Sequence, residues 1–383
     1  MRLAVYTDYT YRRQDGVVYA ERAFALFLDA LAGAPGIAQL ALAGRLEPQP
    51  GTGRYPLTDA VDFVALPFYE TILRPHQAAR QLLASLRRFW RVLDDVDAVW
   101  LLGPNPLALL FACQALVRRR TLVLGVRQDT RAYLRTRHPR RRWIWAIGDA
   151  LEGAWRLLAR RVPVVVVGPE LAAQYARAPR LLPVAISLVR ERDLAEPPPA
   201  RAYEGEITLL SVGRLETEKN PLLMADILAR LNAAAPRWRL TVCGEGPLQE
   251  ALAQRLAELG VAERADLRGY VAQDDGLAEA YRSHHLLLHV SWTEGLPQIL
   301  FEAFAAGLPV VATDVGGIRA AVGEATALIP AGDADAAAEA LERIADDPAR
   351  RAELVAAGLA QAREHTLEAE TGRVARFVAE ALR

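Results

Sequence analysis

Residues 291–307 read Ser291-Trp-Thr-Glu-Gly-Leu-Pro-Gln-Ile-Leu-Phe-Glu-Ala-Phe-Ala-Ala-Gly307 and predict a polar loop that runs into a short helix. Pro297 suits the first helical turn, and Gly307 suits the position just past the helix end. Because the helix is apolar on almost every side, we expect it to be buried. Its one carboxylate, Glu302, then needs a partner, either an internal hydrogen bond or a ligand hydroxyl. The amides at the helix start would attract an anion such as a phosphate.

The string from Glu294 to Glu302, with the Ala-Phe-Ala-Ala-Gly-Leu-Pro-Val-Val-Ala-Thr that follows, resembles the donor-site signature of the family 4 retaining glycosyltransferases. That resemblance implies an α/β chain with the GT-B fold, two Rossmann-like doubly wound domains facing a cleft. It assigns Glu302 to the ribose hydroxyls of a nucleotide-diphosphate sugar and Glu294 to the hydroxyls of the donor sugar. The backbone that it places beside the sugar and the diphosphate is that of Gly295, Leu296, Pro297 and Gln298.

The length of 383 residues is enough for two domains, each with its own core. Short apolar strands alternate with helical segments, which predicts parallel sheets covered on both faces. We expect an acceptor-binding domain at 1–200 and a donor-binding domain at 201–370, joined by the stiff connector Glu196-Pro-Pro-Pro-Ala200. In the resembling family the last helix, here 371–383, can return to the first domain.

Composition is ordinary for a soluble globular protein, with 52% hydrophobic and 24% charged residues. The N-terminus enters a strand-like run with no signal-peptide pattern, and the apolar stretch 99–117 is broken by Gly103 and Pro104. We therefore expect a cytoplasmic protein, with a position at the inner membrane face as the alternative. Cys113 and Cys243 lack metal or redox spacing and are expected to be reduced core thiols.

The net charge of zero is unevenly distributed along the chain. Residues 1–200 contain 28 Arg and 18 Asp or Glu (28 − 18 = +10), whereas residues 201–383 contain 18 basic and 28 acidic residues (18 − 28 = −10). This asymmetry suggests an anionic partner for the first half, although solvated arginine faces explain it equally well. Lys219 is the one lysine among the 46 basic residues.

Lys219 lies in Gly213-Arg-Leu-Glu-Thr-Glu-Lys-Asn-Pro221, where a strand gives way to a helix. Ligands of open α/β sheets bind at this carboxyl edge, and Arg214 with Lys219 would suit a diphosphate. The alternative is a pair of surface salt bridges with Glu216 and Glu218. The resemblance places both cations on the donor diphosphate, so the expected catalytic residues are Arg214, Lys219 and Glu294.

Further loops are expected near the donor on the same resemblance. Gly213 closes the first strand of the second domain, and Gly244-Glu-Gly246 follows the next strand, where a tight turn would also explain the glycines. Tyr270 and Val271 follow a third strand, and the matching backbone of relatives meets the base. An ordinary packed aromatic explains Tyr270 at least as well.

The first domain departs from the family pattern. Many relatives carry a His after a mid-domain strand, but here Arg127 or Gln128 stands in that place. Arg127 would contact a phosphate or an anionic acceptor, or pair with Asp129. Gly16, in the polar loop 10–16 before a helical segment at 17–32, is the other acceptor-side candidate.

We expect no metal and no other cofactor. Asp95-Val-Asp97 matches a short metal-binding pattern but leads into a strand, so capping explains it. Four histidines (His76, His138, His284 and His285) show no ligand spacing. The leaving diphosphate would then be neutralised by Arg214, Lys219 and backbone amides.

The segment 74–93 predicts a helix with one apolar stripe and a basic remainder. Packing against the first domain is one interpretation of the stripe, and docking on anionic lipid is the other. The sequence as a whole favours a retaining, metal-independent glycosyltransferase of hexosyltransferase type, acting on an unidentified acceptor that includes lipid-linked or anionic ones. The alternatives are a sugar-nucleotide epimerase or phosphorylase, and a catalytically silent nucleotide-sugar binding protein.

Overall fold

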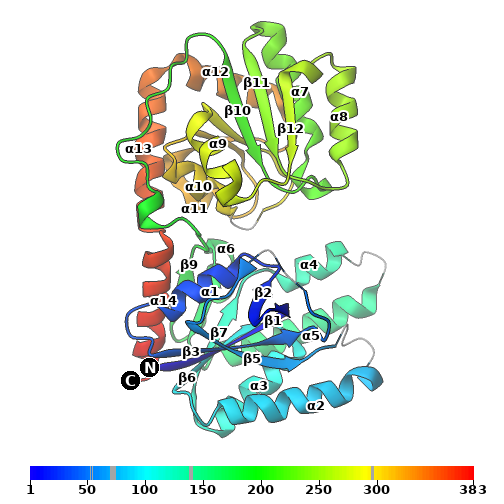
Figure 1. Cartoon of the computed structure of the whole chain (residues 1–383), viewed down its shortest axis with the longest axis vertical. Coiled ribbons are helices and arrows are strands. Elements are labelled where there is room, and N and C mark those ends of the chain that lie inside the picture. Colours follow the sequence, from blue (N-terminus) through cyan, green and yellow to red (C-terminus); the bar gives the residue numbers. More distant parts are fainter. Residues whose placement is uncertain (52, 54, 70–74, 138–140, 295–296) are drawn as a thin grey trace. The chain divides into compact units, whose positions relative to one another are not determined.

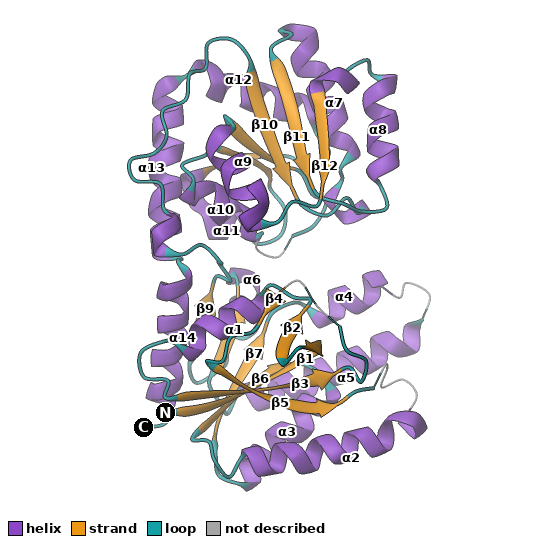
Figure 2. Cartoon of the chain, in the orientation of Figure 1, coloured by secondary structure: helices purple, strands orange, loops and turns teal. Residues whose placement is uncertain are grey.

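A computed structural model describes residues 1–51, 53, 55–69, 75–137, 141–294 and 297–383 (Figure 1). The chain divides into two compact units, Met1–Ile186 with Leu367–Arg383 and Ser187–Thr366. Each unit is an α/β domain in which helices flank a sheet (Figure 2). The predicted α/β class with two Rossmann-like domains is confirmed.

The first unit is built on one sheet that the described residues arrange in nine strands. Its strands are β1 (Arg2–Gln14), β2 (Val17–Ala20), β3 (Gln39–Leu46), β4 (Tyr55–Pro56), β5 (Val61–Pro67), β6 (Ala98–Gly103), β7 (Thr121–Val126), β8 (Val164–Val167) and β9 (Leu181–Val184). The order is β4-β2-β1-β6-β7-β8-β9, with β3 paired to β1 and β5. All pairs are parallel except those of β2, which joins β1 and β4 antiparallel.

The helices of the first unit are α1 (Phe24–Ala32), α2 (Pro75–Val92), α3 (Pro106–Val117), α4 (Thr130–Arg137), α5 (Arg142–Ala159), α6 (Pro169–Gln174) and α14 (Leu367–Ala381). The last helix, α14, is held to β9 by a hydrogen bond from Arg373 to the carbonyl of Pro183 (2.9 Å). It therefore belongs to the first unit although it ends the chain.

The predicted loop at 10–16 and helix at 17–32 differ from the structure. Residues 10–14 belong to β1, residues 17–20 form β2, and the helix α1 begins at Phe24. Asp15 and Gly16 have positive φ (49° and 83°) and form the tight turn of the hairpin between β1 and β2. Asp-Gly favours this turn because both positions need a left-handed backbone. The helical pattern of 17–32 is real only from Phe24 onward.

The apolar stripe of α2 is packed inside the first unit. Phe89 and Leu93 are fully buried, and Leu82 and Leu86 pack against the same core. The ring of Phe89 stacks on that of Phe111 in α3, with centroids 3.9 Å apart. Packing thus accounts for these residues of the stripe, whereas Leu83 of the same stripe is 56% exposed.

The thiols differ in their surroundings, against the prediction of two core cysteines. Cys243, at the end of a strand in the second unit, is buried, but Cys113 is exposed. Cys113 lies on α3 three residues from Leu110 and four from Val117, which are also exposed. This spacing places all three on the outer face of the helix.

The second unit contains one parallel sheet in the order β12-β11-β10-β13-β14-β15. Its strands are β10 (Ile207–Val212), β11 (Trp238–Cys243), β12 (Ala265–Gly269), β13 (Leu286–His289), β14 (Val310–Thr313) and β15 (Thr326–Ile329). Its helices are α7 (Leu222–Ala234), α8 (Gln249–Glu258), α9 (Ala278–Ser283), α10 (Gln298–Ala305), α11 (Ile318–Val322), α12 (Ala334–Asp346) and α13 (Pro348–Glu364). The chain order reverses between β10 and β13, the switch point at which doubly wound sheets bind ligands.

The boundary between the units lies at 186/187, before the predicted boundary at 200. The amide of Ala195 donates to the carbonyl of Ala305 (2.7 Å), and Arg201 donates to that of Gly307 (2.7 Å). These bonds attach the segment to the end of α10. The connector 196–200 is therefore a packed part of the second unit, not a hinge after the first.

Candidate functional site

The candidate site lies at the switch point of the second unit, where β10 and β13 end side by side. These two strands are paired in parallel, so the loops that follow them leave from the same edge of the sheet. Arg214 and Lys219 follow β10, and Glu294 follows β13. The amide of Trp292 donates to the carbonyl of Glu218 (2.8 Å), which ties the two loops together. The structure thus brings Lys219 and Glu294 into contact, and it places Arg214 on the same loop as Lys219.

Glu294 is the centre of this site. Its side chain is 7% exposed, and its Oε1 lies 2.5 Å from Lys219 Nζ. Oε1 also accepts hydrogen bonds from Ser291 Oγ (2.6 Å) and His289 Nε2 (3.0 Å). All of these bonds end on Oε1, so no bond from another described residue occupies Oε2. One carboxylate oxygen is anchored, and the other is available to a ligand hydroxyl.

The protein holds Glu294 as an anion. Burial opposes its ionisation, but the hydrogen bond and charge of His289, followed by those of Lys219, lower its pKa to about 2. A carboxylate that accepts several hydrogen bonds beside a cation is strongly favoured over the acid. Glu294 is therefore suited to accept hydrogen bonds from sugar hydroxyls, and unsuited to act as a general acid near neutral pH.

The two cations of the loop after β10 have different partners, although the sequence offered no reason to distinguish them. Arg214 forms the predicted surface ion pairs, with Glu216 and with Glu218 (3.3 Å to the latter), and its side chain is 63% exposed. Lys219 does not pair with these acids. It is 22% exposed and reaches across to Glu294.

Glycines let the loops of this site approach one another closely. A Cβ on Gly244 would lie 1.7 Å from the carbonyl oxygen of Gly213, and one on Gly246 would lie 2.5 Å from that of Leu215. Gly316, after β14, would collide in the same way with the Glu294 carbonyl at 1.9 Å. These glycines are required because backbone meets backbone, a stronger constraint than the tight turn that the sequence suggested.

Glu302 has the internal partner that its position in α10 predicted. Tyr281 in α9 donates its hydroxyl to Oε2 (2.7 Å). The residue is half-buried, and burial raises the pKa of its carboxyl above the ordinary value of 4.5, partly opposed by this hydrogen bond. Glu302 thus has one bonded oxygen and an incompletely compensated charge.

The remaining donor-side candidates are placed around the same edge. Pro297, where the helix was predicted to open, is the extended N-cap of α10, and the helix begins one residue later at Gln298. Gly269 ends β12, and after it Tyr270 is 47% exposed and Val271 is half-buried. Gly295 and Leu296 lie outside the described residues.

The acceptor-side candidates belong to the first unit. Gly16 is the hairpin turn described above, and Gln128 is exposed after β7. Arg127 is half-buried and stacks on aromatic rings. Burial lowers the pKa of Arg127 to about 10.

Sequence reasoning missed His289, Ser291 and Thr313. His289 closes an otherwise apolar strand, Leu286-Leu-Leu-His289, and this polar residue at a carboxyl edge was a usable signal. Thr313 bridges the backbone of Ser291, since its Oγ1 accepts from the Ser291 amide (3.0 Å) and donates to its carbonyl (3.1 Å). Together these three residues fix the loop that carries Glu294.

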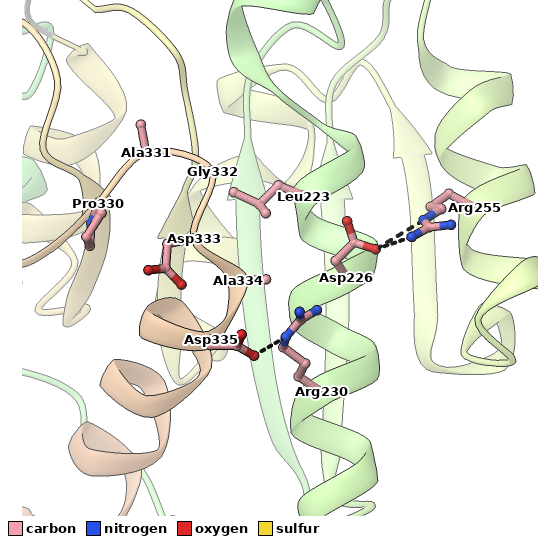
Figure 3. Close-up of a pocket in the computed structure, with 10 residues that line it drawn as sticks. All are labelled: Leu223, Asp226, Arg230, Arg255, Pro330, Ala331, Gly332, Asp333, Ala334 and Asp335. Carbon is pink, nitrogen blue, oxygen red and sulfur yellow. Dashed lines mark hydrogen bonds and ion pairs between the residues drawn. The ribbon is translucent and has the colours of Figure 1, made fainter.

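A hollow of about 520 Å³ lies between α7, α8, the loop after β15 and the start of α12 (Figure 3). Figure 3 shows two ion pairs among its side chains, Asp226 with Arg255 (2.8 Å) and Arg230 with Asp335. None of the predicted site residues lines it. We therefore do not regard it as the donor site.

Two searches of the described part of the chain gave no further centre. Among those residues, no group of three or more His, Cys, Asp or Glu side chains is arranged to hold a metal ion. Over the same residues, no helix is both long and apolar enough to cross a membrane.

Comparison with known proteins finds a family that matches most of the second unit. Residues 194–361 match the family described as "Glycosyl transferases group 1". A D-inositol 3-phosphate glycosyltransferase of Thermobispora bispora is 34% identical over 185 residues, 45% of this chain and 43% of that protein. The phosphatidylinositol N-acetylglucosaminyltransferase gpi3 subunit of Schizosaccharomyces pombe is 30% identical over 141 residues, 36% of this chain and 31% of that protein. The chain thus spans less than half the length of these curated relatives.

Solved structures show similarity of fold over the whole chain. Sucrose-phosphate synthase of Thermosynechococcus elongatus superimposes with a TM-score of 0.71 at 17% identity, covering 99% of this chain and 98% of that one. HepE of Anabaena, in complex with UDP, gives 0.69 at 16% identity, covering 99% and 100%. The chain has the GT-B fold, and its residues 194–361 match the glycosyl transferases group 1 family.

Proposed function

We propose that this protein is a retaining glycosyltransferase that uses a nucleotide-diphosphate sugar and needs no metal ion. The observation that carries the proposal is the contact between Lys219 and Glu294 at 2.5 Å. The bond that breaks joins the sugar to the diphosphate, so a group that binds sugar hydroxyls must lie beside one that neutralises phosphate. The UDP complex of HepE, which shares the fold, supports a nucleotide diphosphate as the ligand.

In this proposal each residue has a separate task. Oε2 of Glu294 accepts hydrogen bonds from the donor sugar, while Lys219 and Arg214 stabilise the charge that develops on the diphosphate. The amides at the start of α10 add a partial positive charge. Retention follows the family interpretation, in which the acceptor attacks from the face of the leaving diphosphate and a phosphate oxygen takes its proton.

A nucleotide screen followed by a transfer assay tests this function. We expect one of UDP, GDP and ADP to raise the melting temperature, because a ligand at ~100 times its Kd adds ~2.7 kcal/mol of stability. The corresponding sugar nucleotide should then be hydrolysed or should glycosylate an acceptor. Binding without either reaction would favour the silent binding protein, and interconversion of free sugar nucleotides would favour an epimerase.

Activity is expected to persist in excess chelator. Lys219 and Arg214 supply two positive charges after β10, which is the neutralisation that a divalent cation would otherwise provide. The measurement is the initial transfer rate with and without EDTA, using protein purified in the presence of the chelator. A large loss that Mg²⁺ or Mn²⁺ restores would contradict the metal-independent mechanism.

The proposal includes a lipid-linked acceptor and peripheral membrane contact, and the support for both is the positive charge on the surface of α2. Most of the apolar stripe of α2 is packed, but the helix also exposes four arginines, Arg80, Arg87, Arg88 and Arg91. Basic side chains alone bind anionic membranes weakly and in a salt-dependent way.

A further inference from the structure

Arg127 is a half-buried cation in the first unit. It directly follows β7, at the carboxyl edge of the first sheet, where loops of α/β domains collect their ligands. Its Nε is buried and has no hydrogen-bond partner among the described residues. Burial alone lowers the pKa of the guanidinium to about 10, so it is still charged near neutral pH. A buried charge without a partner is costly, and such a group calls for an explanation.

The guanidinium is held on an aromatic platform. Its carbon lies 3.9 Å from the centre of the Phe24 ring and 5.6 Å from that of Tyr9. Phe24 is 1% exposed and is itself fixed against Phe27 and Trp100. Stacking uses the face of the guanidinium, and its N–H donors point out along the edge, where they match the oxygens of a carboxylate or phosphate.

The N-terminus of α1 does not add to this cation. Phe24 is the first residue of that helix, but the amides of Ala25 and Leu26 already donate to the carbonyls of Arg22 (3.0 Å) and Ala23 (2.9 Å). An anion at this place would therefore be bound by the guanidinium of Arg127 itself.

We propose that Arg127, held by its aromatic platform at the carboxyl edge of the first sheet, forms an oxyanion-binding site for a carboxylate or phosphate group carried by one of the two substrates. This site rests on the proposed function and adds to it. It implies that one substrate carries a second anionic group, besides the donor diphosphate. The anion can belong to the acceptor or to the transferred sugar, and the same guanidinium chemistry serves both.

Chemical modification tests the site itself and does not depend on the transferase reaction. Phenylglyoxal reacts with arginine, and mass spectrometry resolves each modified position. Inorganic phosphate should slow modification of Arg127 but not of Arg161, an exposed arginine that precedes β8 at the opposite edge of the same sheet. Equal rates with and without phosphate at Arg127 would overturn the proposal.

Three variants separate binding from a structural role. Arg127→Gln should weaken binding of a phosphate- or carboxylate-bearing substrate by roughly tenfold or more, Arg127→Lys should lose less, and Arg161→Gln should resemble the parent. The ligand-free melting temperature of Arg127→Gln should not fall, because an uncompensated charge is removed. A lower melting temperature with unchanged binding would mean that Arg127 only supports the fold.

Paired ligands identify the source of the anion. One arm compares D-inositol 3-phosphate with myo-inositol as acceptor, and the other compares UDP-glucuronate with UDP-glucose as donor. The parent should favour the charged member in one arm, and Arg127→Gln should lose that preference. If neither arm shows a preference that depends on Arg127, the inference is wrong. If the parent protein binds no nucleotide, the result counts against the proposed function instead.

Discussion

Lys219→Ala is expected to lower the rate of sugar transfer by roughly one to three orders of magnitude, the effect of removing one donor to a developing oxyanion. Lys219→Arg should restore only part of the rate, because a planar fork cannot replace a point charge held 2.5 Å from Glu294. The measurement is kcat/KM for transfer, with nucleotide affinity determined separately. Arg192→Ala is the matched control, since Arg192 is 76% exposed and lies outside the site.

The pairing with Glu294 raises a second explanation for such a loss. Lys219→Ala leaves a carboxylate that is 7% exposed without its cation, so the rate could fall because Glu294 is disturbed. A double-mutant cycle with Glu294→Gln separates these effects. If Lys219 acts on the diphosphate, its removal should still lower the rate in the Glu294→Gln background.

The opposite result would change the assignment. If Lys219→Ala has no effect once Glu294 is neutral, the lysine serves only to balance that carboxylate. If Lys219→Ala transfers sugar at the parental rate in both backgrounds, Lys219 has no part in the reaction.

The site could be predicted in part because local sequence carries its chemistry. A helix that is apolar all round and contains one carboxylate implies a partner for Glu302, and Tyr281 provides one. The loop after a β-branched strand implies ligand contact for the cations that follow β10. These expectations depend on residues close in the chain, where periodicity and strand ends are informative.

The partners of these groups could not be predicted because they are distant in sequence. Lys219 meets Glu294 only because β10 and β13 are neighbours in the sheet, although 75 residues separate the pair. The same adjacency decided against salt bridges between Lys219 and the local acids. His289 was missed for a related reason, since a histidine ending a strand shows its purpose only when the loop after it folds back.

The predicted domain boundary at 200 lies after the division at 186/187, because the composition of the connector was given more weight than its packing. The run of prolines at 197–199 looked like a linker, but Pro198 and Pro199 contact Gly307 in the second unit. A stiff segment can link domains or lie on one of them, and composition does not distinguish these cases. The hairpin at Asp15 and Gly16 was the opposite error, because a local turn signal was present and the helical period of the following residues was preferred.

Glu302→Gln is expected to weaken nucleotide binding by roughly ten- to a hundredfold, the loss expected when hydrogen bonds to a charged group become neutral ones. Glu294→Gln should instead lower transfer while nucleotide affinity changes little. Titration calorimetry with the nucleoside diphosphate, alongside transfer rates, measures both. Parental affinity and turnover in both variants would contradict the assignment of these acids to the donor.

Stability should respond to the two substitutions in opposite directions, because the fold shifts the two carboxyls oppositely. Burial raises the pKa of Glu302, so the folded state binds its proton more tightly and loses stability as the pH rises above about 4.5. Glu302→Gln removes this loss and still accepts the Tyr281 hydroxyl, so the ligand-free variant should be at least as stable as the parent at neutral pH.

The pKa of Glu294 is lowered to about 2, so its contribution is present above about 4.5 and disappears as the pH falls toward 2. Glu294→Gln should therefore lower the melting temperature at neutral pH and flatten its decline in acid. A Glu302→Gln variant that melts well below the parent at neutral pH would contradict this expectation and would mean that the charge of Glu302 stabilises the fold.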